Sequence, residues 1–105
     1  MIEISCEELR DLRARGEELL LLDVRQPWEH ELARLPEDRL IPLNELPARL
    51  EEIDESQFIV CYCHHGIRSL TAAAFLERNG VARVASLAGG IDAWSQLIDP
   101  AVPRY

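Results

Sequence analysis

The stretch "FIVCYCHHGIRS", residues 58–69, joins the pattern of a buried strand to the start of a helix. Phe58–Cys61 is apolar throughout, as expected for a strand that is covered on both faces in a parallel sheet. A short loop with two histidines and a glycine follows. A helix is then expected over Ser69–Asn79, with Gly80 ending the apolar spacing. A strand that passes through a short loop into a helix is typical of α/β proteins.

The same alternation continues on both sides of this stretch. Further strands are expected at residues 2–4, 19–24, 40–43 and 83–87, and further helices at residues 6–15, 26–31, 45–53 and 91–98. Ser5 and Glu8 have the spacing of a capping box, Gly16 is expected to end that first helix, and Asn44 is the expected N-cap of the third. The pattern predicts an α/β fold with a five-stranded, mainly parallel sheet flanked by helices on both faces.

Length and charge limit the classes of function. A chain of 105 residues has the size of one compact domain, which we expect to span residues 1–105. The formal net charge is −8 and all 11 cations are arginines, so a basic surface for nucleic acid is not expected. The N-terminus lacks a signal-peptide pattern, and no apolar run approaches the roughly 20 residues of a membrane span. We therefore expect a cytoplasmic protein that binds neither nucleic acid nor membrane; the sequence predicts no oligomeric state.

The three cysteines, Cys6, Cys61 and Cys63, cannot all pair within the chain, which favours reduced thiols over a disulfide scaffold. Cys61 lies inside the expected strand and is interpreted as a buried, inert residue. Cys63 follows that strand, at the sheet edge where open α/β proteins bind ligands. His64 and His65 add metal-ligand types, but no second ligand pair is evident in the sequence, so no metal is expected. An imidazole that tunes charge near the sulfur is expected instead, from either histidine.

Residues 63–69, called here the Cys63 loop, have the composition of an anion cradle around a nucleophile. The N-terminus of the following helix offers unpaired N–H groups, which would favour the ionised form of the Cys63 thiol. Gly66 allows the backbone to turn so that several N–H groups converge. Arg68 would add a cation for an oxyanion, and Ser69 would either cap the helix or offer its hydroxyl to the pocket.

Two other segments are interpreted in relation to this pocket. Asp23 and Arg25 follow the second expected strand, and an ion pair that orders the loop is the favoured interpretation, with direct support of the pocket as the alternative. Trp28 and Trp94 are expected to pack against the core, since each lies in an amphipathic helical segment.

Three segments resemble the rhodanese family of sulfurtransferases, in the same order along the chain. "CHHGIRS", residues 63–69, is similar to the active-site loop C-x-x-G-x-R-S of that family. "LLLLDVRQPWEHE", residues 19–31, resembles its D-V-R segment, and "LAGGIDAWSQ", residues 87–96, resembles its glycine–glycine turn and tryptophan helix. One segment departs from the pattern, because "ARLPEDRLIPL", residues 33–43, stands where many members have "GHIPGA".

The resemblance implies a five-stranded sheet and a cysteine that carries a persulfide between a sulfur donor and an acceptor. Cys63 would carry the persulfide and Arg68 would help to bind the donor. The residues that would cradle the persulfide are His64, His65, Gly66, Ile67, Arg68 and Ser69. The backbone of Gly89 and Gly90 would line the mouth of the pocket.

A sulfurtransferase is therefore the leading hypothesis. Cys63 would take a sulfane sulfur from a donor such as thiosulfate and pass it to cyanide, a thiol or a protein acceptor, by covalent catalysis that needs no metal or organic cofactor. The alternative is a rhodanese-like docking or regulatory module without catalysis of its own. A phosphatase is disfavoured, because four residues separate Cys63 from Arg68 whereas the related cysteine phosphatases have five, a wider cradle that suits phosphate.

Overall fold

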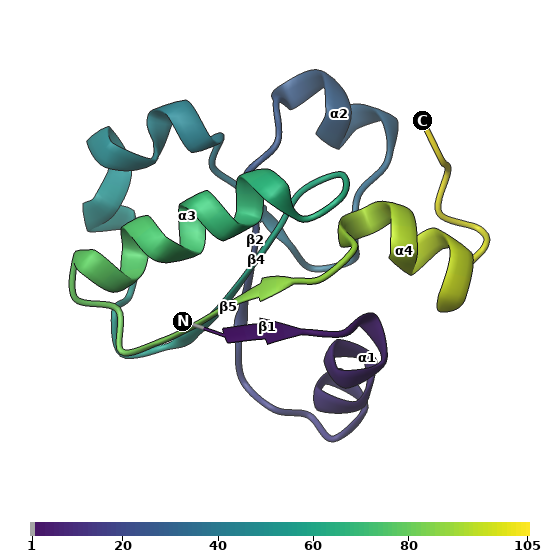
Figure 1. Ribbon diagram of the computed structural model, residues 1–105, viewed down its shortest axis with the longest axis horizontal. Coiled ribbons are helices and arrows are strands. Elements are labelled where there is room, and N and C mark those ends of the chain that lie inside the picture. Colours follow the sequence, from purple (N-terminus) through teal and green to yellow (C-terminus); the bar gives the residue numbers. More distant parts are fainter. Residues whose placement is uncertain (1) are drawn as a thin grey trace.

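The computed structural model describes residues 2–105 and has one central sheet between layers of helices (Figure 1). Within these residues, five strands pair in parallel in the order β1-β5-β4-β2-β3. The strands are β1 (Ile2–Ile4), β2 (Leu20–Asp23), β3 (Arg39–Leu40), β4 (Phe58–Tyr62) and β5 (Arg83–Leu87). The α/β prediction is confirmed, and the described sheet is parallel throughout.

Helices cover both faces of the sheet. They are α1 (Cys6–Ala14), α2 (Pro27–Leu32), the 3-10 helix η1 (Leu43–Glu52), α3 (Ile67–Arg78) and α4 (Gly90–Leu97). In β4, Val60 and Tyr62 join the core formed with α1 and α4, whereas Ile59 and Cys61 join the core formed with α3 and η1. This period of two is what a strand buried on both faces requires. Strand β4 is thus the central strand of the sheet, and its two neighbours are β5 and β2.

Helix α1 begins as its sequence predicts. The backbone N–H of Glu8 donates to the Ser5 hydroxyl oxygen at 3.0 Å, and the N–H of Ser5 donates to the Glu8 carboxylate at 3.1 Å. These reciprocal bonds form the capping box, which satisfies two donors that a helix start leaves free. Gly16 follows the helix with a φ of 72°, the left-handed conformation that glycine adopts at helix ends.

Helix η1 differs from the helix predicted over residues 45–53. It begins at Leu43, with Pro42 rather than Asn44 at its N-cap, and it has the tighter 3-10 geometry. Arg49 leaves helical backbone angles, with φ −123° and ψ 21°, and Pro47 lacks the N–H of a regular α-helical bond. The segment therefore follows a kinked path over the sheet.

Helix α3 also begins earlier than predicted, at Ile67 instead of Ser69. Gly66 occupies the N-cap with a φ of 108°, which strongly favours a residue without a Cβ atom. The chain therefore turns sharply before the helix, and Ser69 lies within the first helical turn.

Two predictions are wrong in the segment between β2 and η1. Strand β3 spans Arg39–Leu40 instead of residues 40–43, because Pro42 has no N–H to donate to a ladder. Trp28 of α2 is 60% exposed, so its predicted place in the core is incorrect. Trp94 of α4 is 6% exposed and packs in the core as predicted.

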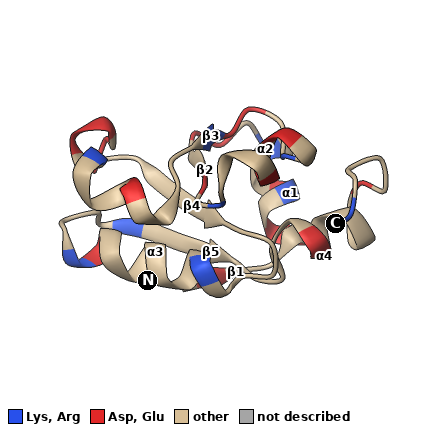
Figure 2. Cartoon of the chain, turned by 90° about the horizontal axis from the view of Figure 1, so that it is seen from above, with Lys and Arg blue, Asp and Glu red and all other residues tan. Residues whose placement is uncertain are grey.

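Charged residues are spread over the described elements. In the view of Figure 2, arginine positions are scattered among the acidic positions and do not gather into one stripe. Of the helices within residues 2–105, none has both the length and the apolarity to cross a bilayer.

The turn between β5 and α4 packs directly against the Cys63 loop. The N–H of Ile91 donates to the carbonyl oxygen of Cys63 at 2.9 Å, and the N–H of Asp92 donates to that of His64 at 3.1 Å. A Cβ atom at Gly90 would overlap these two carbonyl oxygens. The contact between the two loops therefore requires glycine at position 90.

We expect Gly90→Ala to destabilise the fold more than Gly16→Ala. Gly90 and Gly16 have φ values of 60° and 72°, so each substitution carries the strain of left-handed backbone, about 1–2 kcal/mol. Nothing lies within 4 Å of a Cβ at Gly16, whereas overlap at Gly90 adds about 1–3 kcal/mol. Urea unfolding followed by circular dichroism measures the difference. Equal losses of unfolding free energy in the two variants would contradict the close approach at Gly90.

Candidate active site

Cys63 follows β4 directly and is 1% exposed. Its Sγ accepts hydrogen bonds from the backbone N–H of Gly66 at 3.1 Å and from that of Ser69 at 3.3 Å. Both N–H groups lie at the N-terminal end of α3, where backbone donors have no partner within the helix. The sulfur therefore lies where free donors of a helix N-terminus converge.

The Ser69 hydroxyl lies beside the same sulfur. Its Oγ is 3.5 Å from Sγ of Cys63 and donates to the carbonyl oxygen of Gly66 at 3.1 Å. Oγ of Ser86, on β5, is 2.7 Å away. Of the two roles considered for Ser69, capping is wrong because Gly66 is the N-cap, and the hydroxyl lies beside the sulfur.

The two histidines of the Cys63 loop form part of an aromatic stack. The ring of His64 lies between those of His65 and Tyr105, with centroid distances of 4.0 Å to each. Burial, and next the positive charge of His65, lower the pKa of His64. His65 is exposed, and its Nε2 lies 3.7 Å from the Asp92 carboxylate. Neither imidazole has a hydrogen bond to the sulfur in the described part of the chain, and the effect of a histidine on the charge near Cys63 stays a prediction.

Arg68 forms an ion pair with Glu29 of α2. Its Nη1 and Nη2 donate to the two carboxylate oxygens of Glu29 at 2.6 and 2.9 Å, which is a bidentate arrangement. The Glu29 side chain is buried, whereas that of Arg68 is 37% exposed. Burial alone would raise the pKa of Glu29, but hydrogen bonds from Arg68, Tyr105 and the Gln26 backbone outweigh it and lower the pKa to about 2. The carboxylate is therefore ionised at any physiological pH.

Tyr105 connects this ion pair to the rest of the sheet edge. Its hydroxyl donates to Oε2 of Glu29 at 2.6 Å and accepts from Nη1 of Arg25 at 2.9 Å. Its ring stacks on His64 and meets Trp28 edge-on at 5.9 Å. Burial and the bond to Glu29 raise the pKa of Tyr105 to about 12, so the hydroxyl keeps its proton.

Arg25 and Asp23 form a buried ion pair, which is the interpretation that the sequence favours. Neither side chain is exposed, and Nε and Nη2 of Arg25 each donate to a carboxylate oxygen of Asp23 at 2.8 Å. Nη2 also donates to the carbonyl oxygen of Ala33 at 2.6 Å. Burial opposes the charge of Arg25, but the bonds to Asp23 and Tyr105 raise its pKa. The pair orders α2 against β2 and reaches the Cys63 loop through Tyr105.

Two groups of side chains bring metal-ligand types together in the described residues. The groups are His64, His65 and Asp92, and Asp23, His30 and Asp38, with ligand atoms within 4.8 Å of one another in each. In both groups a carboxylate is already paired with an arginine, at 2.8 Å in Asp23–Arg25 and at 3.1 Å in Asp92–Arg104. The arginine charge opposes a cation at either place, so we assign no metal role to these residues.

The other two thiols are suited to packing and not to chemistry. Burial, and next the charge of Glu7, raise the pKa of Cys6 to about 11. Burial, and next the charge of Cys63, raise the pKa of Cys61 to about 12. Both side chains stay protonated at neutral pH, in agreement with the interpretation of Cys61 as an inert core residue.

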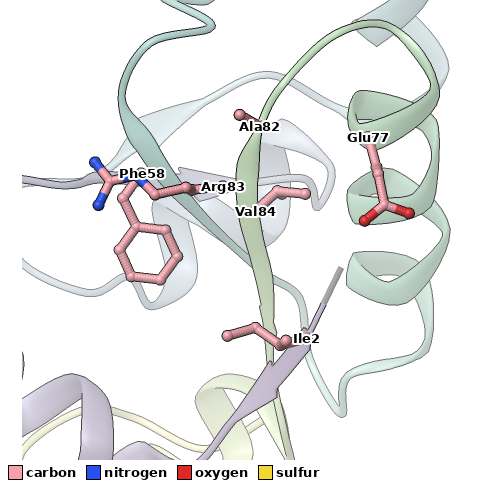
Figure 3. A pocket seen from close by; sticks show the side chains of 6 residues that line it. All are labelled: Ile2, Phe58, Glu77, Ala82, Arg83 and Val84. Atoms are coloured by element: carbon pink, nitrogen blue, oxygen red, sulfur yellow. The ribbon is translucent and has the colours of Figure 1, made fainter.

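A separate hollow of about 340 Å³ lies near the amino ends of β4 and β5 (Figure 3). It is lined by Ile2, Phe58, Glu77, Ala82, Arg83 and Val84. Ligands of parallel sheets bind at the carboxyl ends of the strands, which is the end that carries Cys63. The six lining residues include no cysteine, histidine or serine.

The sequence pattern of the rhodanese-like domain matches residues 5–97, which include the whole Cys63 loop. This match covers most of the chain. The chain belongs to the rhodanese-like domain family. The resemblance noted in the sequence is thereby confirmed.

Relatives of this rhodanese-like domain have sulfur-transfer names. A protein of Allochromatium vinosum named sulfurtransferase is 38% identical over 94 residues, which are 90% of this chain and 88% of that protein. The adenylyltransferase and sulfurtransferase MOCS3-2 of Zea mays is 35% identical over 109 residues, which cover 97% of this chain but 23% of that protein. The chain therefore belongs among the rhodanese-like sulfurtransferases, and it spans about a quarter of the larger relative.

A solved structure agrees with this family assignment. The crystal structure of a rhodanese-like domain protein from Staphylococcus aureus superimposes with a TM-score of 0.86 at 26% identity. The superposition covers 100% of this chain and 99% of that one. The similarity therefore extends over the sheet and all of the helices that surround the Cys63 loop.

The rhodanese-like fold brings together most of the residues that the sequence singled out. Gly66, Ser69 and the sulfur of Cys63 are in direct contact, and a Cβ at Gly66 would lie 3.3 Å from the backbone nitrogen of Gly89. Ile67 differs, because it is 77% exposed and turns away from the sulfur.

Sequence reasoning missed Glu29 and Tyr105. Glu29 lies three residues after Gln26, and this spacing forms the capping box at the start of α2, so a local signal was present. The contact of Glu29 with Arg68 spans 39 positions, and that of Tyr105 with Glu29 spans 76. No local pattern in the sequence reveals pairs at such separations.

We expect Arg25→Met to lower the free energy of unfolding by about 3–5 kcal/mol, because it leaves the Asp23 carboxylate buried without its partner. The double variant Asp23→Asn/Arg25→Met is expected to recover part of that loss, since both charges are then removed. The control is Arg10→Met, which breaks an exposed pair with Asp11 and is expected to cost less than about 1 kcal/mol. Urea unfolding measures all three variants. Equal losses for Arg25→Met and Arg10→Met would show that the buried pair contributes no more than a surface pair.

Proposed function

We propose that this rhodanese-like domain transfers a sulfane sulfur from a donor such as thiosulfate to a thiophilic acceptor through a persulfide on Cys63. The observation that carries the proposal is the pair of N–H groups, from Gly66 and Ser69, that donate to Sγ at 3.1 and 3.3 Å. Donors fixed in this way stabilise negative charge on sulfur without reorganisation during the reaction. The partial positive charge at the start of α3 acts in the same direction.

In the first half-reaction, the Cys63 thiolate attacks the outer sulfur of thiosulfate. A new S–S bond forms to Sγ, the S–S bond of the donor breaks, and sulfite leaves with its electron pair. The total charge is −3 before and after this step. The reactants are the thiolate, with one negative charge, and thiosulfate, with two; the products are the persulfide, with one, and sulfite, with two. The outer sulfur of the persulfide is also anionic, so the same N–H groups stabilise reactant and product.

In the second half-reaction, the acceptor attacks the outer sulfur of the persulfide. With cyanide, a C–S bond forms, the S–S bond to Sγ breaks, and thiocyanate leaves while Cys63 returns as a thiolate. Charge and atoms balance in both steps without a metal or organic cofactor. Two separate half-reactions on one nucleophile are expected to give ping-pong kinetics.

The rest of the Cys63 loop shapes the site in this proposal. His64 and His65 close one side with their stacked rings, and the backbone of Gly66 turns its N–H inward. Arg68 supplies the cation that faces an anionic donor. Gly89 and Gly90 let the neighbouring turn pack against the loop and form the mouth of the pocket.

The thiols and the relatives support a proposal for the natural setting of the reaction. All three cysteines are free, which suits a reducing compartment such as the cytoplasm. A relative from Bacillus subtilis, 36% identical over 93 residues, is named a putative sulfur carrier protein. A sulfur-accepting protein is therefore proposed as an acceptor beside small thiols.

The intact mass of the protein tests the proposal directly. We expect the wild type to gain the mass of one sulfur atom after incubation with thiosulfate and to lose it to cyanide, with release of thiocyanate. Cys63→Ser is expected to gain none, because the attacking sulfur is absent. Cys61→Ser is the matched control and is expected to gain and lose sulfur as the wild type does, since Cys61 stays protonated in the core.

Sulfur that adds equally to wild type and Cys63→Ser would overturn the assignment of the nucleophile. A wild type that adds no sulfur from thiosulfate or from an organic persulfide would overturn the proposed transfer. That second result would favour the docking module, which binds a partner equally well with Cys63→Ser.

A further inference from the structure

We propose that Glu29 is a specificity-determining residue, which weakens the binding of doubly charged sulfur donors by holding Arg68 in an internal ion pair. The inference rests on the proposed function, because it concerns how the donor reaches Cys63. It predicts that the site prefers sulfane donors with one negative charge, or none, over the thiosulfate dianion.

The geometry of the ion pair places the Glu29 carboxylate beside any anion that Arg68 binds. Both of its terminal nitrogens face the Glu29 carboxylate, at 2.6 and 2.9 Å. A guanidinium has five N–H donors, so a donor anion can use those that Glu29 leaves free, but it then lies next to the negative charge of the Glu29 carboxylate. Glu29 is thus a built-in competitor of anionic donors.

Glu29 cannot turn away from Arg68 easily. Its Oε1 accepts from the backbone N–H of Gln26 at 3.1 Å, and its Oε2 accepts from the Tyr105 hydroxyl at 2.6 Å. The Tyr105 hydroxyl accepts in turn from the fully buried Arg25 at 2.9 Å. The carboxylate therefore has a fixed position, and its side chain is buried.

Arg68 lies close enough to the sulfur for this competition to matter. It precedes Ser69, whose N–H donates to Sγ of Cys63 at 3.3 Å, and the Tyr105 ring, whose hydroxyl binds Glu29, stacks on His64 next to Cys63. A donor that places its outer sulfur on Sγ thus brings its anionic end near both Arg68 and Glu29. Repulsion by Glu29 grows in proportion to the charge of the donor. It therefore weakens the binding of a dianion more than the binding of a monoanion.

Steady-state kinetics with two donors tests this inference. The donors are thiosulfate and methanethiosulfonate, which has the same bond between sulfonyl sulfur and outer sulfur but carries one negative charge and releases methanesulfinate. With cyanide as the acceptor, thiocyanate formation gives the KM of each donor. The decisive quantity is the KM for thiosulfate divided by the KM for methanethiosulfonate.

We expect Glu29→Gln to lower this ratio by about tenfold, because the amide keeps the shape of the side chain but removes its charge. The matched control is Glu31→Gln, which removes the same charge from an exposed position of α2 and is expected to leave the ratio within about twofold of the wild type. A merely structural role of Glu29 would change both KM values together and leave the ratio unchanged.

A second variant keeps the test independent of how well Glu29→Gln folds. Tyr105→Phe removes one anchor of the carboxylate while keeping the ring that stacks on His64, and it is expected to lower the ratio in the same direction by a smaller factor. An unchanged ratio in both variants, with persulfide still forming on Cys63, would overturn the role of Glu29 alone. Absence of the persulfide in wild type with either donor would overturn the proposed function and this inference together.

Discussion

A guanidinium group without exposed surface organises the carboxyl end of the sheet. Arg25 is fully buried, and a buried charge is tolerated only where acceptors surround it. Its acceptors come from Asp23 in β2, from backbone carbonyl groups of α2 and the residue that follows it, and from the Tyr105 hydroxyl. This requirement fixes α2 beside β2 and brings the C-terminal segment back over the sheet edge. Glu29 also lies in α2, and the position of this helix holds the Glu29 carboxylate opposite Arg68.

The N-termini of two helices form hydrogen bonds with the Cys63 loop. The N-terminus of α4 donates to the carbonyl oxygens of Cys63 and His64. The N-terminus of α3 then presents N–H groups to Sγ from the other side. Gly90 permits the first contact and Gly66 the second, since a Cβ at either position would strain or obstruct the backbone. The sulfur thus faces two backbone N–H donors and the hydroxyl group of Ser69.

The sequence was sufficient to predict the succession of strands and helices along the chain and the position of Cys63 after a strand, because apolar spacing and glycine turns are local signals. It misplaced the start of α3, where the left-handed Gly66 caps the helix two residues early, and it missed the 3-10 form of η1 around Pro47. The ion pair of Glu29 with Arg68 was beyond local reasoning. It depends on where α2 docks, and that docking is decided by the tertiary contacts of Arg25.

The position of β4 within the sheet has a consequence for internal motion. β4 is paired along both edges, whereas the outer strands β1 and β3 have three and two residues. Amide hydrogen exchange proceeds through local opening, which begins where few backbone bonds have to break. The margins of the sheet therefore fray first, and the strand that leads to Cys63 belongs to the slowest-exchanging unit. Cys63 therefore stays shielded from bulk water while the outer strands open.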